Sequence, residues 1–217
     1  MTYIYLIRHC EAMGNLKRVF QGSTDCDISE TGAKQLEYLK ERFKNIRLDA
    51  VYSSPLIRAR KTAEAAAFGK GLEIITRQNL TELNGGVLEG RPFQEAFNSI
   101  AGLADTWNNH PQDFAPEGGE AMRNAYVRIY DEITELVRIN RGKTVAAVSH
   151  GGVLRCLMCR VLYNDINRLK DVPWCENTAV TLLKIDDSDK IGVEFFNDYS
   201  HVPPEYMPKR SRIVSMA

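Results

Sequence analysis

The 217-residue sequence lacks a long hydrophobic run, an excess of charge of either sign and a cysteine framework. Its longest N-terminal apolar run, 2–7, ends at Arg8, so we expect neither a secretory signal nor a membrane-spanning helix. Lys and Arg total 28, as do Asp and Glu, and this balance excludes a strong electrostatic footprint for nucleic acid or an anionic membrane. Five cysteines are an odd number in a long chain, which favours reduced thiols and predicts a cytoplasmic protein.

Apolar and amphipathic segments alternate along the chain without an internal repeat. Predicted strands cover 2–7, 49–54, 72–76, 144–149, 178–185 and 191–197, and predicted helices begin at Ser29 or Thr31, at Pro55, near Glu120 and at Val153. We expect residues 81–119, which are rich in Gly and Pro, to be irregular. The alternation predicts a single α/β domain, 1–217, built as a three-layer α/β/α sandwich around a mostly parallel central sheet.

Cationic or potentially cationic side chains follow three of the predicted strands. They are Arg8 and His9 after the first strand, Arg58 in the helix after the second, and His150 after the strand 144–149. In such sheets, ligands bind outside the carboxyl ends of the strands. A phosphate group can accept paired hydrogen bonds from guanidinium groups and from N–H groups at helix starts. The sequence therefore predicts a phosphate-binding site at this edge of the sheet.

Five short motifs occur in the order in which one known family carries them. They are LIRHCEAMGN, FQGSTDCDISETG, VYSSPLIRARKTAE, LTELNGGVLEG and VSHGGVLR. Each motif is weak alone, but the ordered set resembles the histidine phosphatase superfamily, the phosphoglycerate mutase-like enzymes, over residues 4 to about 155. The resemblance implies the phosphoglycerate mutase-like form of the α/β/α fold, with a cap-like insertion at about 82–119.

The resemblance also implies a role for each matching residue. His9 matches the nucleophile that becomes phosphohistidine, and Glu82 rather than Glu89 matches the acid that protonates the leaving oxygen. The groups that hold the transferring phosphoryl are matched by Arg8, Arg58 and His150. Positions that line the phosphate or substrate site are matched by Asn15, Gln21, Gly22 and Gly151. The implied partner is a small phosphorylated substrate or inorganic phosphate, with neither a metal nor another cofactor.

One residue departs from the family pattern. The usual glycine after the nucleophile is Cys10 here, so a β-carbon must fit where glycine permits close approach. A thiol beside a phosphate site could have a lowered pKa and be oxidisable. The alternative, which we favour, is that Cys10 is a small buried residue.

Two other groups of residues are not assigned to the predicted site. Cys156 and Cys159 form a Cys-x-x-Cys within a predicted helix, and no second pair completes a metal site. We interpret them as apolar-face residues. The tail 203–217 has no clear period, and we interpret its basic residues as a solvated end; they are Lys209, Arg210 and Arg212.

The segment 91–119 bears on which reaction occurs. A mutase needs a strongly basic pocket for two acidic groups. This segment has only Arg91 and His110 as basic residues, and its acidic residues are Glu95, Asp105, Asp113 and Glu117. The paired-Arg segment of the family's mutases is absent, Gly152 stands where they usually have Asn, and FAPEGGEAM resembles the phosphatase branch. We therefore predict hydrolysis of a phosphate monoester. A cofactor-dependent phosphoglycerate mutase is the first alternative, and a non-catalytic phospholigand-binding protein is the second.

Overall fold

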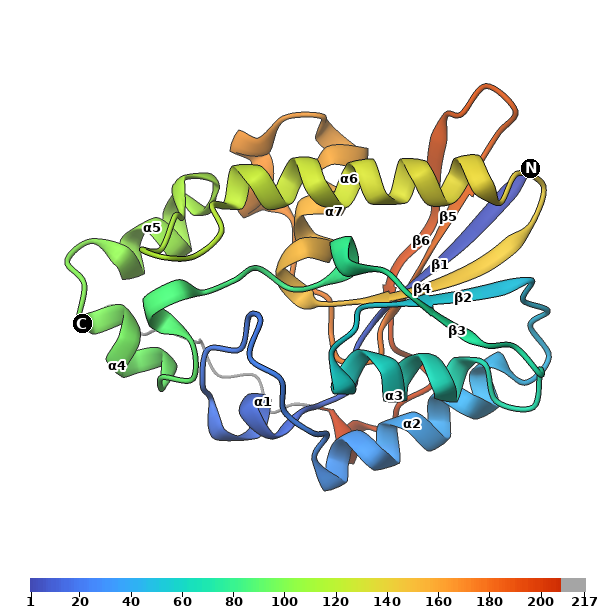
Figure 1. Cartoon of the computed structure of the whole chain (residues 1–217), viewed down its shortest axis with the longest axis horizontal. Helices are drawn as coiled ribbons and strands as arrows, with labels where there is room; N and C mark the ends of the chain where they lie inside the picture. Colours follow the sequence, from blue (N-terminus) through green and yellow to red (C-terminus); the bar gives the residue numbers. More distant parts are fainter. Residues whose placement is uncertain (208–217) are drawn as a thin grey trace.

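The computed structural model of the chain describes residues 1–207, so Lys209, Arg210 and Arg212 lie outside the described residues. Within 1–207, six strands form one sheet in the order β3-β2-β4-β1-β5-β6 (Figure 1). The strands are β1 (Thr2–Arg8), β2 (Ala50–Ser53), β3 (Ile74–Thr76), β4 (Thr144–Ser149), β5 (Val180–Ile185) and β6 (Ile191–Asp198). The first four run parallel, whereas β5 and β6 pair antiparallel at one side. The predicted, mostly parallel sheet is confirmed.

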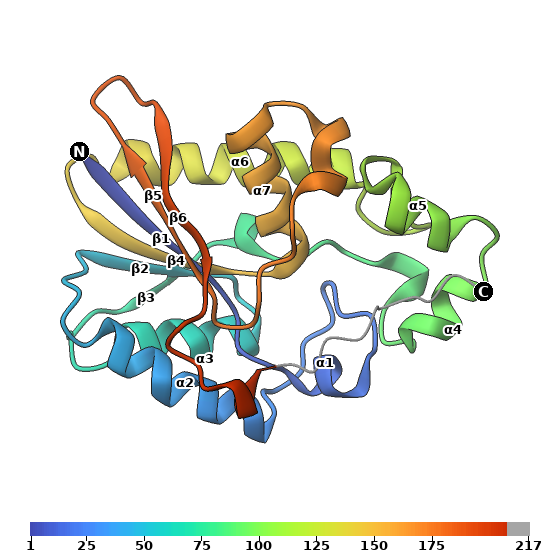
Figure 2. The ribbon, with the colours of Figure 1, turned by 180° about the vertical axis from the view of Figure 1, so that it is seen from behind.

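Helices cover both faces of this sheet (Figures 1 and 2). One face carries α2 (Glu30–Phe43) and α3 (Ile57–Ala66), and the other carries α6 (Met122–Ile139) and α7 (Gly151–Tyr163). The shorter helices are α1 (Met13–Lys17), α4 (Phe93–Asn98) and α5 (Leu103–Asn109). Short 3₁₀ helices are η1 (Gln78–Leu80), η2 (Gly86–Leu88), η3 (Pro111–Asp113), η4 (Ile166–Asp171) and η5 (Pro204–Tyr206). This arrangement confirms the three-layer α/β/α prediction.

The central strands are apolar because both of their faces are buried. Leu6 of β1 belongs to the core on the α6 and α7 side, and its neighbour Ile7 belongs to the core on the α2 and α3 side. The same alternation occurs in β4, where Ala147 and Val148 face opposite cores. A strand between two helical layers therefore reads as a continuous apolar run.

The helix after β2 begins later than the sequence predicts. Pro55 is not its first residue, because Leu56 still has an extended backbone, with ψ 138°, and the helix starts at Ile57. The Leu56 N–H donates to the Ser54 hydroxyl at 3.4 Å, which closes a turn ahead of the helix. Arg58 is therefore the second residue of α3 and lies at its amino end.

The prediction that 81–119 is wholly irregular was wrong. The segment contains α4 and α5, of 6 and 7 residues, in addition to two 3₁₀ turns. Helices of this length are marginal alone and too short to display a helical period in the sequence. Tertiary packing of their aromatic residues stabilises them here.

Aromatic packing joins 82–119 to the loop that follows β1. The Phe20 ring contacts Phe93, Phe97 and Phe114 at centroid distances of 5.4 to 6.2 Å. Trp107 packs edge-on against Phe114 at 4.8 Å. Figure 1 shows α4 and α5 beyond the carboxyl ends of β1 and β4, at the end of the molecule away from the N-terminus. The role of the segment as a cap stays a prediction.

Candidate active site

Two histidine rings meet at the carboxyl ends of β1 and β4. The parallel register pairs Arg8 with Ser149, so the next residue of each strand, His9 and His150, follows side by side. Their ring centroids lie 5.0 Å apart, and the rings are 4% and 0% exposed. The His9 N–H donates to the Ser149 carbonyl at 3.0 Å, which continues the strand pairing by one residue. One tetrahedral ion can therefore contact both rings.

The surroundings of His9 set its protonation. Its Nδ1 lies 2.7 Å from the Cys10 carbonyl oxygen, which can only accept, so Nδ1 carries the proton and donates. Nε2 then presents a lone pair. Burial lowers the pKa of His9 well below its ordinary value, and the positive charges of Arg58 and Arg8 lower it further. The ring is held neutral, in the tautomer that leaves Nε2 free to attack.

His150 is buried beside the same charges. Its Nε2 lies 2.8 Å from the Ser54 hydroxyl, and its buried Nδ1 has no hydrogen-bond partner within residues 1–207. Burial lowers the pKa of His150 well below its ordinary value, with added repulsion from Arg58. Sequence reasoning missed Ser54, whose signal was its place in the Ser-Ser-Pro turn after β2.

Two arginines flank the rings, Arg58 fully buried and Arg8 partly buried. Arg58 is 1% exposed and donates through Nη1 and Nη2 to the carbonyls of Thr24 and Gly22, at 3.0 Å each. Arg8 donates through Nη1 to the Cys175 carbonyl. Neither guanidinium has an ion pair with a carboxylate among the described residues, and each has a buried Nε without a partner there. Burial lowers the pKa of both groups, but an arginine stays charged in a protein.

Glu82 lies beside the amino end of α7, the helix that begins directly after His150. Its carboxylate accepts hydrogen bonds from the N–H groups of Gly152 at 2.9 Å and Val153 at 3.1 Å. A β-carbon at Gly152 would lie 2.7 Å from Glu82 Oε1, so glycine is what permits this approach. These two N–H groups belong to the start of the helix, which has no earlier turn to bind them, and they fix the position of the Glu82 side chain.

The structure brings two of the four predicted lining residues to this group. The Gly22 carbonyl binds Arg58, and a β-carbon at Gly151 would lie 3.2 Å from Arg8 Nε. The other two contact their own loop instead. Asn15 Oδ1 accepts from the Ala12 N–H at 3.0 Å, and Gln21 packs on Gly14. These contacts give Asn15 and Gln21 a part in loop structure, and their contact with substrate stays a prediction.

Sequence reasoning also missed the residues that hold the backbone of the site. Asn177 Nδ2 donates to the His9 carbonyl at 2.9 Å, and the Thr178 N–H donates to the Arg8 carbonyl at 3.1 Å. Thr62 Oγ1 accepts from the Cys10 N–H at 3.0 Å. All three side chains are polar and nearly fully buried. The only sequence signal was Asn177-Thr178 at the start of a predicted apolar strand.

Cys10 is a small core residue with an ordinary backbone. It is fully buried, it is absent from the residues with positive φ, and burial raises the pKa of its thiol to about 12. A lowered pKa is thereby contradicted, and the favoured interpretation holds. Cys156 is buried as well, with its Sγ 3.3 Å from Met122 Sδ. Among the residues that the structure describes, no group of three or more His, Cys, Asp or Glu is arranged to hold a metal ion.

Together these groups suit a tetrahedral oxyanion. The unpartnered nitrogens Arg8 Nε, Arg58 Nε and His150 Nδ1 are buried, and leaving such groups unpaired costs free energy. An anion that accepts their hydrogen bonds would offset that cost and the positive charge together. The His9 lone pair beside them adds a nucleophile, so the arrangement can bind and transfer a phosphoryl group.

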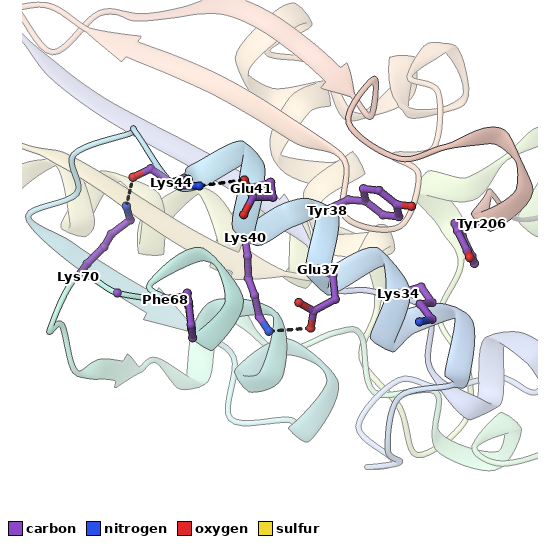
Figure 3. A pocket seen from close by; sticks show the side chains of 10 residues that line it. Lys34, Glu37, Tyr38, Lys40, Glu41, Lys44, Phe68, Lys70 and Tyr206 are labelled. Carbon is purple, nitrogen blue, oxygen red and sulfur yellow. Dashed lines mark hydrogen bonds and ion pairs between the residues drawn. The ribbon is translucent and has the colours of Figure 1, made fainter.

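A groove on the outer face of α2 is separate from this site (Figure 3). It has a volume of about 770 Å³ and none of the predicted site residues line it. Two of its lysines are engaged locally, since Lys40 pairs with Glu37 at 2.7 Å and Lys70 donates to the Phe43 carbonyl at 2.8 Å. No helix within 1–207 is long and apolar enough to span a membrane.

Comparison with known proteins gives consistent matches. A family model described as the histidine phosphatase superfamily (branch 1) matches residues 4–198. Phosphoserine phosphatase 1 of Hydrogenobacter thermophilus is 29% identical over 190 residues, 86% of this chain and 88% of that protein. Phosphoglycerate mutase-like protein 4 of Arabidopsis thaliana is 31% identical over 203 residues, 92% of this chain and 86% of that protein. The solved structure of Bacillus stearothermophilus YhfR has a TM-score of 0.87 at 30% identity, covering 93% and 99% of the two chains.

The lowered pKa values predict two neutral rings in mildly acidic solution. At pH 5.5, about one unit below the ordinary value, an unperturbed imidazole would be about 90% protonated. Nitrogen NMR shifts of His9 and His150 should instead show neutral rings at that pH. Because the unfolded chain binds these protons and the folded chain does not, the free energy of unfolding should fall as the pH drops below about 6.5. Rings that are fully charged at pH 6 would contradict the assignment.

Proposed function

The chain belongs to the histidine phosphatase superfamily, and from this premise we propose that it hydrolyses the phosphate monoester of a small phosphorylated metabolite through a phosphohistidine intermediate. The observation that carries the proposal is the pair of neutral, buried rings 5.0 Å apart beside two arginines that lack a carboxylate partner within 1–207. The similarity to a phosphoserine phosphatase supports it.

In the first step, His9 Nε2 attacks the phosphorus, and the bond between phosphorus and the ester oxygen breaks. Protonated Glu82 gives its proton to that oxygen, so the alcohol leaves neutral. The resulting carboxylate is held by the N–H groups at the start of α7. The charge on the three equatorial oxygens is stabilised by Arg8, Arg58 and His150.

In the second step, a water molecule attacks the phosphorus of phosphohistidine. The Glu82 carboxylate accepts a proton from the water, and the bond between phosphorus and Nε2 breaks. Inorganic phosphate leaves, and His9 returns to the neutral tautomer that the Cys10 carbonyl fixes. No group outside this set is needed to balance protons or charge.

Hydrolysis is favoured over transfer back to a second acidic substrate. Arg91, a cation of the segment 91–119, is engaged by Glu95 at 3.2 Å and by the Ser99 hydroxyl at 3.2 Å. These two local contacts compete with a second acidic group for the Arg91 guanidinium. The similarity to a phosphoglycerate mutase-like protein keeps the mutase reaction as the second candidate.

We also infer a reducing compartment, the cytoplasm. All five cysteines are free, and four of them are buried. Free buried thiols persist where thiol reductants keep them reduced. The partner proposed for the site is a small phosphorylated molecule.

A product assay separates the two reactions. With 3-phosphoglycerate and a trace of the bisphosphate, we expect inorganic phosphate to be released at a steady rate, measured together with 2-phosphoglycerate. Formation of 2-phosphoglycerate without inorganic phosphate would establish the mutase. Inactivity towards a broad panel of phosphomonoesters, with retained phosphate binding, would favour a non-catalytic binding protein.

Replacement of the nucleophile should abolish turnover. In His9→Ala we expect no phosphatase activity and no acid-labile phosphoryl label after a rapid quench, because the Nε2 of the other ring, His150, is engaged by the Ser54 hydroxyl. Thermal unfolding should still be cooperative, since the ring contributes little apolar burial. His110→Ala, at an exposed position, is the control and should keep both activity and label. A labelled His9→Ala protein would refute the role of His9.

Replacement of Glu82 should depend on the leaving group. Glu82→Gln cannot donate the proton, so kcat for an alkyl phosphate such as phosphoserine should fall about 10²–10⁴-fold. The loss with p-nitrophenyl phosphate should be much smaller, because its phenolate leaves without protonation. Steady-state rates with both substrates measure the difference. Equal losses would show that Glu82 is not the acid.

A further inference from the structure

One carboxylate holds the loop segment 22–24. The N–H groups of Gly22, Ser23 and Thr24 donate to Glu89 at 3.2, 2.9 and 3.1 Å. The Gly85 N–H donates at 2.6 Å, and the hydroxyls of Ser23 and Thr24 donate as well. We call Glu89 with these donors the Glu89 clamp. It joins the loop after β1 to the segment that follows Glu82.

The clamp requires both oxygens of a carboxylate. Oε1 of Glu89 accepts from the N–H groups of Ser23 and Gly85, and Oε2 accepts from those of Gly22 and Thr24. A glutamine side chain has one oxygen and one NH₂ group. In either orientation, its NH₂ group would face two N–H donors, so an amide cannot replace the acid.

Glycines allow the close approach of the carboxylate. A β-carbon at Gly22 would lie 2.3 Å from Glu89 Oε1 and 1.8 Å from the Leu83 carbonyl oxygen. At Gly85 it would lie 3.2 Å from the same Oε1 and 2.3 Å from the Phe20 ring. Only glycine fits at these two positions, so the backbone can pass close to the Glu89 carboxylate.

The opposite side of segment 22–24 binds Arg58. Gly22 and Thr24, which donate their N–H groups to Glu89, present their carbonyl oxygens to the Arg58 guanidinium at 3.0 Å each. Segment 22–24 thus lies between the Glu89 carboxylate and the Arg58 guanidinium. A shift of Glu89 would therefore move the carbonyl groups that bind Arg58. Arg58 is 1% exposed, and these two carbonyls are the hydrogen-bond acceptors that the structure shows for its Nη atoms within 1–207.

We propose that Glu89 is a positioning residue for Arg58: it fixes segment 22–24, whose carbonyl groups fix the guanidinium against the phosphoryl group. The inference rests on the proposed function, in which Arg58 holds that group during transfer. All hydrogen bonds shown for Glu89 go to segment 22–24 or to Gly85. Glu89 therefore acts through Arg58, and displacement of a charge-stabilising group by about 1 Å can cost on the order of 10²-fold in rate.

Glu89 stays charged under working conditions. Burial alone would raise its pKa, but the hydrogen bonds from Thr24, Gly85 and Ser23 outweigh burial and lower the pKa from its ordinary value of 4.5. The stabilisation that the charged form gives is present above pH 4.5 and is lost as the pH falls through the lower folded value. The hydrogen bonds of the Glu89 clamp are therefore intact throughout the neutral pH range.

Glu89→Gln tests the clamp, since it keeps the size of the side chain. With p-nitrophenyl phosphate we expect kcat to fall about 10–100-fold, and amide hydrogen exchange at Ser23 and Thr24 to accelerate at least tenfold. In an Arg58→Met background, the same change should cost less than about twofold, because a residue that acts through Arg58 loses its effect there.

Matched variants keep the test decisive. Glu95→Gln, which changes an exposed acid that pairs with Arg91, should leave both kcat with p-nitrophenyl phosphate and exchange unchanged. Thr24→Val removes one hydroxyl donor and should lower kcat a few-fold, which serves if Glu89→Gln does not fold. Parent-like kcat in a folded Glu89→Gln protein, or full additivity with Arg58→Met, overturns the proposal. If the parent hydrolyses no phosphomonoester, the proposed function fails, and the exchange rates together with the Kd for inorganic phosphate decide on the clamp alone.

Discussion

Two guanidinium groups that form no ion pair with a carboxylate among the described residues are the constraint on which the site depends. Arg8 and Arg58 are held by backbone carbonyls, whose dipoles orient the charge without cancelling it. A buried charge is costly unless it is paired, so the remaining attraction is left for an anion. Burial lowers the pKa of both neighbouring rings, and the same charges lower it further, which keeps the rings neutral. The two arginines therefore contribute both to anion binding and to the protonation state of the rings.

The backbone supplies most of the precision of the site. Bonds from β4 and from the start of β5 fix the chain at His9, and helix N–H groups hold Glu82. Glycines lie where a β-carbon would collide with a side chain of the proposed active site, as at Gly152 beside Glu82. Few of these contacts join two polar side chains, because backbone groups make most of them. The site is therefore held in place by the same backbone that forms the sheet.

Periodicity and motif order were enough to predict the layers, the parallel strands and the strand ends that carry His9 and His150. They could not predict α4 and α5, whose short length hides their period and whose stability comes from contacts with Phe20 far away in sequence. Ser54 and Asn177 were missed because small polar residues near turns have no periodic signal, and only tertiary structure shows that they are buried. The start of α3 was placed too early because proline fits a turn as well as a first helical position.

The aromatic packing around Phe97 is joined to the sheet through the loop that carries Phe20, whereas His9 is fixed by its neighbouring strands. Substitutions on α4 and α5 that keep the contacts of Phe20 and Trp107 can therefore change the side chains beyond the strand ends while His9 stays in place. Under the proposed function, descendants of this chain can acquire another substrate and keep the same reaction.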